Sequence, residues 1–470
     1  MRRILRKISI TLIATTVVPS VYADTLPKRP NILHIHADDH RADGLHALGN
    51  SILQTPNLDW LVEHGMTFNH CYTMGSMIGA VCTPSRTMML TGRSWQRIPK
   101  APGASPMASN PSTFLPRVMD AAGYKTWHMG KAGNGFPAGL REFQTSIIDD
   151  ASGPTPQNDR AHCSERLADR TIDFLKARNS ESDRKPFYIY LAPPVPHDPR
   201  SAEPRFHQLY TAAKIRLPAA FMPVHPFDNG EMNVRDEQLA PWPRTEADTK
   251  QQIADYDSCI TSLDYHVGRI FEELKASGEW DNTIIIFTGD NGLSLGEHGL
   301  FGKQNLYEFG GMHVPCVIAG PGIPKGKSDA LIYLMDLFPT LTDLAGTKAP
   351  EGVEGKSIVP ILTGKSTKLR DTLYTAYRNC QRAVRDDRWK LIRYPLIDKV
   401  QLFDLVADPH EMHNLAGMPE HAAQVATMTR LLEKEMNSYG DHAPLTIRNP
   451  KPADWTPPTG KPLKLKTKKP

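Results

Sequence analysis

Short apolar runs alternate with longer amphipathic stretches through most of the chain. Apolar runs of this length, bounded by polar turn residues, predict buried strands, and the stretches between them predict helices. The alternation is typical of an α/β fold in which a large mixed β-sheet is sandwiched by helices. The four clearest predicted strands are Asn31–His36, Phe187–Leu191, Thr283–Phe287 and Val314–Ala319.

The pattern changes after about residue 370. Short alternating runs at 372–377, 382–394 and 400–405 precede an amphipathic stretch at 420–439, which predicts a small antiparallel sheet followed by a helix. We therefore expect a large domain over residues 24–370, a small one over 371–447 and an extended tail over 448–470, which is rich in proline and lysine. The proline-containing segment 200–250 is expected to be a long ordered excursion that shapes a pocket.

The first 23 residues are typical of a signal peptide. Positive charges precede an apolar run from Ile8 to Val18, and Val21-Tyr22-Ala23 resembles a cleavage site. The apolar run is too short to span a bilayer comfortably. We expect an exported protein, periplasmic or secreted, without stable membrane insertion.

The amino-acid composition and net charge limit the classes of protein to which the chain can belong. Hydrophobic residues make up 40% and charged residues 23% of the 470 residues, which excludes disorder throughout the chain. The formal charge of +4 fits an anionic substrate but is too small to indicate nucleic-acid binding. The six cysteines show no paired metal-ligand spacing; export makes disulfides between them possible, but their spacing specifies no pairing.

Polar motifs follow three of the predicted strands. Asp38 and Asp39 follow the first, His197 follows the second, and Asp290 and Asn291 follow the third. Ligands of open α/β sheets gather beyond the carboxyl ends of strands. Oxygen-bearing side chains of this kind suit a hard cation such as calcium or magnesium, although a single aspartate in such a place is more often a helix cap.

Cys82-Thr83-Pro84-Ser85-Arg86 resembles the Cys-x-Pro-x-Arg signature of the type I, formylglycine-dependent sulfatases, which belong to the alkaline phosphatase superfamily. Pro84 suits the first turn of a helix, so the cysteine is expected at a helix N-terminus that favours an anion. The resemblance extends over most of residues 29–415. It rests on further motifs in the family's order: Arg29–Leu33 leading to Ala37–Asp39, Thr55–Asp59, Gly123–Thr126 leading to Gly130-Lys131, Pro196–Pro199, Gly289–Gly292, Gly296–Gly299 leading to Gly302-Lys303, Arg388–Leu391 and Leu402–Leu405.

The resemblance implies a set of roles. Cys82 would be oxidised by a formylglycine-generating or sulfatase-maturating enzyme to a formylglycine, whose hydrated aldehyde attacks the sulfur of a sulfate ester. Arg86 would hold this group, Lys131 and Lys303 would grip the sulfate oxygens, and His197 would contact the sulfate and protonate the leaving alcohol. The calcium ligands would be Asp38, Asp39, Asp290, Asn291 and the formylglycine made from Cys82.

One position departs from the family. Many sulfatases have a histidine two residues after the first of these lysines, where this chain has Gly133. That histidine helps to position or deprotonate the formylglycine in relatives, so its role here is vacant or has moved. Two interpretations of His128 stay open. It takes over the role of the histidine expected at Gly133, or it is a helix-face histidine that packs against the sheet.

The resemblance implies an exported, calcium-dependent sulfatase, and export favours a sulfated carbohydrate as its substrate. Two alternatives stay open. One is a phosphoester or phosphonate monoester hydrolase that uses the same formylglycine, and the other is a non-catalytic glycan-binding protein that keeps the fold.

Overall fold

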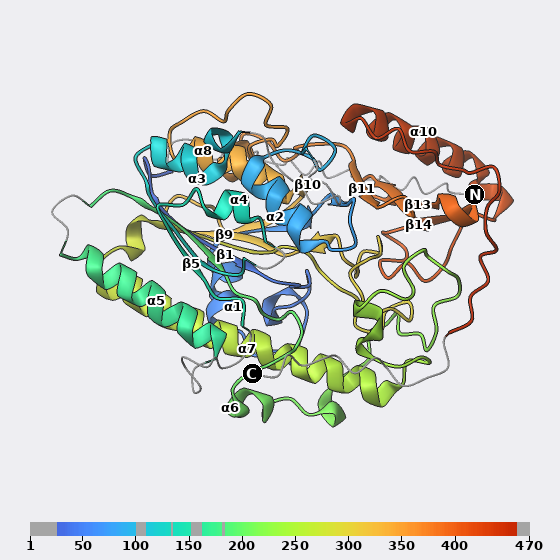
Figure 1. The fold of residues 1–470 in the computed structure, drawn as a ribbon, viewed down its shortest axis with the longest axis horizontal. Helices are drawn as coiled ribbons and strands as arrows, with labels where there is room; N and C mark the ends of the chain where they lie inside the picture. Colours follow the sequence, from blue (N-terminus) through green and yellow to red (C-terminus); the bar gives the residue numbers. More distant parts are fainter. Residues whose placement is uncertain (1–25, 100–109, 133–134, 152–161, 181–183, 458–470) are drawn as a thin grey trace, which may run out of the picture.

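The structure is a computed structural model that describes residues 26–99, 110–132, 135–151, 162–180 and 184–457. The predicted signal peptide and residues 458–470 of the predicted tail lie outside the described residues. Within them, the chain forms a large sheet between two helical layers and a smaller sheet beside it (Figure 1). The predicted fold class is confirmed.

The large sheet has nine strands, and most neighbouring pairs are parallel. Strands β8 and β9 run antiparallel to their neighbours. The prediction of one strand over Val314–Ala319 is wrong, because Pro315 lacks the N–H that a continuous strand needs and separates β8 from β9. The order across the sheet is β10 (Gly326–Tyr333), β2 (Met66–Tyr72), β9 (Cys316–Ala319), β7 (Thr283–Gly289), β1 (Asn31–Ala37), β6 (Phe187–Ala192), β4 (Lys125–Gly130) and β5 (Thr145–Ile148), with β8 (His313–Val314) paired to β2.

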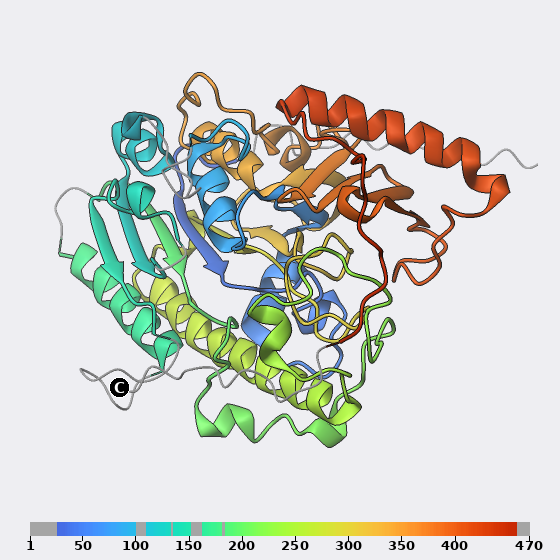
Figure 2. The same ribbon diagram turned by 45° about the vertical axis from the view of Figure 1, so that its right-hand side comes forward.

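Helices cover both faces of this sheet (Figures 1 and 2). Side chains of β1 alternate between the two cores: Leu33 and Ile35 pack on one side, and Ile32 packs on the other. One layer contains α1 (Pro56–His64), α5 (Cys163–Arg178) and α7 (Glu246–Ala276), and the other contains α2 (Cys82–Thr91), α3 (Leu115–Ala121), α4 (Pro137–Leu140) and α8 (Leu337–Leu344). The motif Thr55–Asp59 forms the start of α1.

The smaller sheet has four antiparallel strands covered by the helix α10 (Ala422–Tyr439), as the sequence predicts, and a fifth strand that pairs parallel and was not predicted. Met428, Leu432 and Met436 recur every four residues on the buried side of α10 and pack into the core of this sheet. Its order is β14 (Lys399–Asp404), β13 (Trp389–Tyr394), β12 (Gln381–Arg385), β11 (Leu373–Tyr377) and β3 (Gly75–Ser76). Strand β3 comes from the segment just before Cys82, so the smaller sheet adjoins that region of the chain.

Residues 200–245 contain the short helix α6 (Pro204–His207) and brief 3-10 turns, which fits the predicted excursion, but the excursion ends before residue 250 because α7 begins at Glu246. A further short helix, α9 (Val359–Leu362), lies near the end of the large domain predicted from the sequence. In the part of the chain that the structure describes, no helix combines the length and the apolar character that crossing a membrane requires.

Candidate active site

Four neighbouring strands of the large sheet, in the order β7, β1, β6 and β4, carry the site at their carboxyl ends. All three pairings between them are parallel, so their polar ends meet at one edge. Asp290 directly follows β7, Asp38 directly follows β1, and Lys131 directly follows β4. His197 lies on the loop that leaves β6. Residues far apart in the sequence are therefore brought together by the sheet order.

Helix α2 begins at Cys82 and supplies the opposite wall of the site. Its first-turn N–H groups have no partner within the helix, and Pro84 fits there because it has no N–H to satisfy. Arg86 follows one turn later and is 1% exposed. Its Nε donates to Asp290 Oδ2 at 2.9 Å, and its Nη1 donates to the Tyr190 hydroxyl at 3.1 Å. Arg86 thereby fixes α2 against the strand ends.

The predicted metal ligands form one cluster. Each of Asp38, Asp39, Cys82 and Asp290 offers an atom within 4.8 Å of the others, and all four residues are buried. Asn291 joins them by donating from Nδ2 to Asp39 Oδ1 at 2.7 Å. The Asp38 Oδ1 and Asn291 Oδ1 atoms are buried and accept no hydrogen bond, and the Arg86 guanidinium lies 3.7 Å from Asp38 Oδ1. Unpartnered acceptor oxygens beside further carboxylates are what a hard cation such as calcium requires.

Asp39 has a left-handed backbone with φ of 61°. Aspartate tolerates this region better than most residues, but the conformation still costs free energy relative to extended backbone. The Asp39 N–H donates to Asp290 Oδ1 at 3.0 Å, which helps to hold the turn. The turn places the side chains of two consecutive residues, Asp38 and Asp39, in the same cluster.

Two lysines balance these carboxylates. Lys303 Nζ lies 2.6 Å from Asp39 Oδ1 and 3.1 Å from Cys82 Sγ. Lys131 Nζ forms an ion pair with Asp38. Burial disfavours both charged amines, but the facing carboxylates outweigh it and raise the pKa of each lysine. Both ammonium groups therefore carry full positive charge beside Cys82.

The same surroundings shift the pKa values of Asp38, Asp290 and Cys82 in different directions. Burial disfavours the charged form of Asp38, but Lys131, His197 and Arg86 outweigh it and hold its pKa well below the usual range. Burial raises the pKa of Asp290 to about 6 despite its contact with Arg86. Burial, together with the charge of Asp290, raises the pKa of the unmodified Cys82 thiol well above its usual value. The encoded cysteine is therefore a poor nucleophile in this position.

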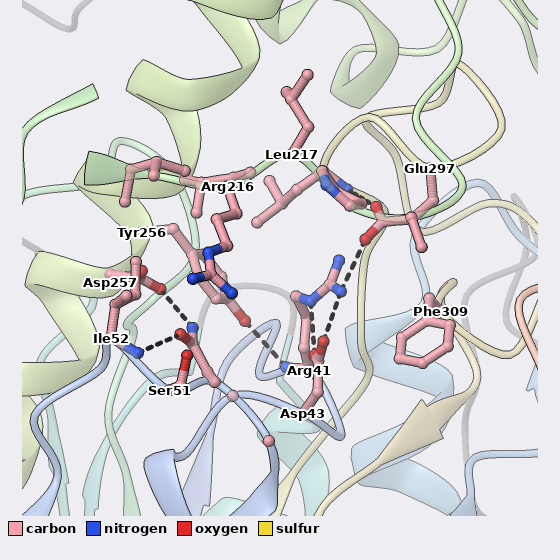
Figure 3. Close-up of a pocket in the computed structure, with 18 of the residues that line it drawn as sticks. Arg41, Asp43, Ser51, Ile52, Arg216, Leu217, Tyr256, Asp257, Glu297 and Phe309 are labelled. Carbon is pink, nitrogen blue, oxygen red and sulfur yellow. Dashed lines mark hydrogen bonds and ion pairs between the residues drawn. The ribbon is translucent and has the colours of Figure 1, made fainter. Parts of the chain in front are cut away.

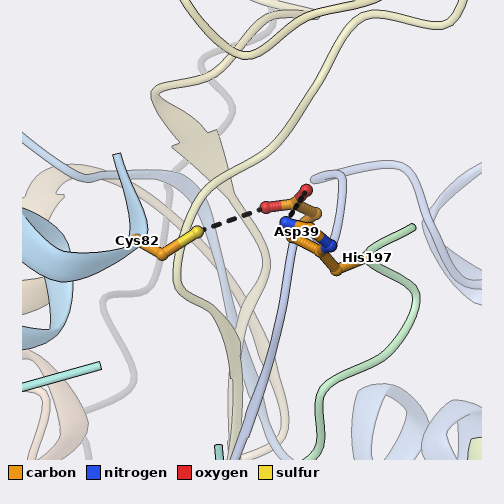
Figure 4. Close-up of side chains that lie close together, drawn as sticks. All are labelled: Asp39, Cys82 and His197. Carbon is orange, nitrogen blue, oxygen red and sulfur yellow. Dashed lines mark hydrogen bonds and ion pairs between the residues drawn. The ribbon is translucent and has the colours of Figure 1, made fainter. Parts of the chain in front are cut away.

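His197 approaches the cluster from the β6 side and faces Asp39 (Figure 4). Its Nδ1 lies 2.6 Å from the carbonyl oxygen of Asp198, which makes Nδ1 the protonated nitrogen. Its Nε2 lies 3.7 Å from Asp39 Oδ2. With Nδ1 held in this way, Nε2 is the nitrogen that faces the site.

His128 does not join the cluster. It lies in strand β4, which corrects the alternative that it is on a helix face. Its Nδ1 contacts Ser146 Oγ at 2.9 Å, and its ring stacks near Tyr190. Burial and the charge of Arg86 lower its pKa to about 3, so it is neutral. None of its contacts is with Cys82, and Gly133 lies outside the described residues.

The structure adds residues around the site that the sequence did not reveal. The Tyr256 hydroxyl, from the middle of α7, donates to the Asp39 carbonyl oxygen at 2.8 Å. Gln304 donates to Asp236 at 2.8 Å beside Lys303, and Asp236 comes from the proline-containing excursion. These residues carry no motif, and only the order of the elements in space shows that they border the site.

All six cysteines are buried and unpaired in the structure.

The sulfatase family model matches residues 30–347, and a model of the C-terminal region of N-sulphoglucosamine sulphohydrolase matches residues 296–438. The chain belongs to the sulfatase family. It is an enzyme of the sulfuric ester hydrolase class, in agreement with the prediction from the cysteine signature.

Individual relatives agree with this family. An N-acetylglucosamine-6-O-sulfatase of Bacteroides thetaiotaomicron is 27% identical, over 89% of this chain and 88% of that protein. The solved structure of a protein in complex with its substrate D-glucosamine-2-N,6-O-disulfate has a TM-score of 0.74 at 24% identity and covers 89% of this chain and 99% of that one. A phosphonate monoester hydrolase of Agrobacterium radiobacter has a TM-score of 0.72 at 22% identity, over 87% of this chain and 96% of that one. At these identities the two solved structures show a shared fold.

Proposed function

We propose that this sulfatase is exported, carries a formylglycine made from Cys82, binds calcium and hydrolyses a sulfate ester of a carbohydrate to an alcohol and inorganic sulfate. The observation that carries the proposal is the position of Cys82. It opens a helix, and its sulfur lies 3.1 Å from the Lys303 amine and within the carboxylate cluster. Residue 82 therefore has the Lys303 amine beside it, which would attract an anion, and the carboxylate cluster, which would bind a metal ion.

The formylglycine would supply a hydrated aldehyde as the nucleophile and would be made by a formylglycine-generating or sulfatase-maturating enzyme. The environment of the encoded residue supports this modification, because a thiol whose pKa is raised well above its usual range has little thiolate at neutral pH. Arg86, held against Asp290, fixes the helix turn that presents this group.

Calcium fits the donor set. The ligands would be Asp38, Asp39, Asp290, Asn291 and the formylglycine at position 82. The unpartnered oxygens of Asp38 and Asn291 support this, because buried acceptors without donors are costly unless a cation satisfies them. When bound, the ion would make the attacking hydroxyl more acidic and neutralise part of the carboxylate charge.

Lys131 and Lys303 would bind the sulfate oxygens. A fixed positive charge attracts an anion more strongly in a buried site than in water. This attraction stabilises the transition state as negative charge grows on the departing oxygen. Lys303 Nζ lies 3.1 Å from Cys82 Sγ, Lys131 Nζ pairs with Asp38 of the same cluster, and both lysines are buried by more than nine-tenths. The unpartnered first-turn N–H groups of α2 add a further anion-binding element.

His197 would protonate the leaving alcohol from Nε2. Its contact with the Asp198 carbonyl fixes the ring and leaves Nε2 as the group that faces the cluster. Its Nε2 lies 3.7 Å from Asp39 Oδ2, so a proton on Nε2 would face the cluster. Positioned general acids of this kind contribute most when the leaving group is a poor one.

The substrate class and the cellular location extend this proposal. The relative named as an N-acetylglucosamine-6-O-sulfatase supports a sulfated sugar, and the predicted signal peptide supports a periplasmic or secreted location. The division into a catalytic domain over residues 24–370 and a small domain over 371–447 stays a prediction.

The test compares a sulfate ester and a phosphate ester of one alcohol on enzyme co-expressed with a formylglycine-generating enzyme. We expect sulfate release to be much the faster reaction and to be lost in Cys82→Ala. Faster phosphate release would contradict the sulfatase assignment in favour of a phosphoester hydrolase. Turnover that survives in Cys82→Ala would contradict the role of residue 82.

A further inference from the structure

A cavity of about 280 Å³ opens behind the turn that carries Asp39, and none of the candidate catalytic residues lines it. Tyr256 separates the two sites, because its hydroxyl donates to the Asp39 carbonyl oxygen at 2.8 Å and accepts from the Arg41 N–H at 2.9 Å. The cavity is walled by the segment after β1, by α7 and by residues 215–219 (Figure 3).

Most of the charges in this cavity are already paired. Arg41 forms ion pairs with Asp43 and with Glu297, both at 2.8 Å. Those three residues form one network on a single side of the cavity (Figure 3). A guanidinium that two carboxylates already hold has little capacity left for a ligand.

Two charged residues of the cavity, Asp257 and Arg216, lie outside this network. Asp257 is 1% exposed; its Oδ1 accepts from Asn50 at 3.2 Å, and its Oδ2 has no hydrogen-bond partner. Arg216 is exposed, makes no ion pair or hydrogen bond with any other described residue, and reaches into the space beside Asp257 and Tyr256 (Figure 3). The cavity thus offers one acceptor without a donor and one donor without an acceptor.

The rest of the wall is mixed, with the polar side chains of Asn50, Ser51 and His410 beside apolar ones. Leucine and isoleucine side chains from four segments supply its apolar part, with the ring of Phe309 at one end. A ligand that suits this cavity therefore has an apolar face together with groups that donate to a carboxylate and accept from a guanidinium. Adjacent hydroxyl groups on a ring do both, because each hydroxyl is a donor and an acceptor.

We propose that this cavity is a second ligand site that binds one neutral pyranose unit of a carbohydrate, with Asp257 and Arg216 contacting adjacent hydroxyls. The balance of charge argues for a neutral unit. An anionic unit would meet Asp43, Asp257 and Glu297, and an ammonium ligand would meet Arg41 and Arg216. Burial and the charge of Asp43 raise the pKa of Asp257 to about 7, which is consistent with a carboxyl group that lacks donors. The inference stands apart from the chemistry at Cys82, so either can fail alone.

The test uses the whole protein with Cys82→Ala, so that catalysis does not interfere. Sulfate-free methyl glycosides of glucose, galactose and N-acetylglucosamine, and sulfate-free oligosaccharides of the same units, are titrated by calorimetry and by saturation-transfer NMR. Binding of a methyl glycoside assigns the site to a single unit. Binding of the oligosaccharide alone assigns it to a unit within a chain.

Two further changes locate the binding. Asp257→Asn keeps the shape and removes the charged acceptor, and we expect binding about tenfold weaker. Ala219→Trp places a large ring at the cavity wall, and we expect no detectable binding. The matched control is Glu272→Gln, an exposed carboxylate on the same helix whose loss should leave binding unchanged.

The proposal is overturned if none of these sugars binds, or if binding is the same in Asp257→Asn and Ala219→Trp as in their parent. It is also overturned if butylammonium or inorganic sulfate binds at this cavity more tightly than every neutral sugar tested.

Discussion

At the residue scale, the site is a set of matched charges. Lys131 faces Asp38, and Lys303 faces Asp39, so each carboxylate at the end of β1 has its own ammonium group. A bound sulfate ester would have to share these lysines with the carboxylates. A divalent cation among the carboxylates would relieve this competition, because it would take over part of the charge that the lysines now balance.

Removing His197 tests its assignment as the general acid. In His197→Ala we expect kcat/KM for a sugar sulfate to fall by roughly 10²- to 10³-fold, because an alkoxide leaves poorly without a proton. The loss should be much smaller for nitrophenyl sulfate, whose phenolate leaves without assistance. Steady-state kinetics on both substrates measures the difference.

His207→Ala is the control, since His207 is a partly exposed histidine whose side-chain contacts, from the Ala202 N–H at 3.2 Å and with Asp255 at 3.7 Å, involve no residue of the cluster. It should leave both rates unchanged. An equal loss for the two substrates in His197→Ala would mean that His197 binds sulfate and does not protonate the leaving group.

Asp257 predicts a pH dependence of stability. Its pKa is raised from 3.8 in the unfolded chain to about 7 in the fold, so the folded state holds this proton more tightly. The resulting stabilisation is complete below about pH 4 and is lost as the pH rises through 7. Asparagine does not titrate, so the free energy of unfolding of Asp257→Asn lacks this fall with pH. Relative to the wild type, the variant should therefore become more stable between pH 4 and pH 7, by at most about 4 kcal/mol.

Urea unfolding of both proteins at pH 4, 5.5 and 7.5, without added sugar, measures this gain. A difference between the two proteins that is constant with pH would contradict the raised pKa.

At the element scale, the loop from Gly302 to Gly311 holds Lys303 in place. Gly311 packs directly on the backbone of Lys303: a Cβ added at Gly311 would lie 1.8 Å from the Lys303 carbonyl oxygen. The Gly311 carbonyl in turn accepts from the Gly292 N–H at 3.0 Å, next to Asn291. The loop therefore couples the position of one lysine to the metal-binding turn.

Gly311→Ala tests this coupling. The added methyl group must push the Lys303 backbone away, so we expect kcat/KM to fall by about tenfold or more and the free energy of unfolding to fall by about 1–3 kcal/mol. Gly417→Ala is the control, because a Cβ there meets nothing within 4 Å. Unchanged kinetics in Gly311→Ala would contradict the coupling.

Elements of the fold were predictable where the sequence pattern was local. Strands β1, β6 and β7 are continuous apolar runs between turn residues, and α10 has a regular apolar face. The break between β8 and β9 was missed, although Pro315 is visible in the sequence, because the run on both sides of it is equally apolar. The placement of His128 was missed because a buried strand and a helix segment can have the same short apolar pattern.

At the scale of the whole molecule, the two sheets are joined by a buried charged cluster. Glu308, on the loop that carries Lys303, accepts from Arg385 at 3.0 Å and from Lys390 at 2.9 Å, and both partners belong to the smaller sheet. A buried carboxylate with two such partners is costly to separate from them. The smaller sheet therefore supports one wall of the site.

Calcium should stabilise the whole fold. A ligand that binds only the folded state adds about 2.7 kcal/mol at a hundredfold excess over its Kd, so calcium should raise Tm by a few degrees over chelator-treated protein. Asn291→Ala should reduce this rise, while the surface change Asn437→Ala should not. The same rise in Asn291→Ala as in the wild type would contradict the proposed ligand set.

Much of the candidate site was predictable because its residues sit in short motifs at strand ends. Asp38, Asp290 and Lys131 each follow a strand directly, so the sequence places them at one edge once the strands are known. Tyr256 and Asp236 could not be predicted, since a residue in the middle of a helix or in an irregular loop approaches the site only through tertiary packing. The cavity around Asp257 was equally invisible, because its walls come from segments about 200 residues apart.

The central claim is that residue 82 acts as a formylglycine. The most direct test is the mass of the peptide that contains residue 82, taken from enzyme whose sulfatase activity has been measured after co-expression with a formylglycine-generating enzyme. We predict the mass of an aldehyde in place of the thiol, in a fraction of molecules that rises and falls with activity. Full activity from protein in which Cys82 is an intact thiol would contradict the account.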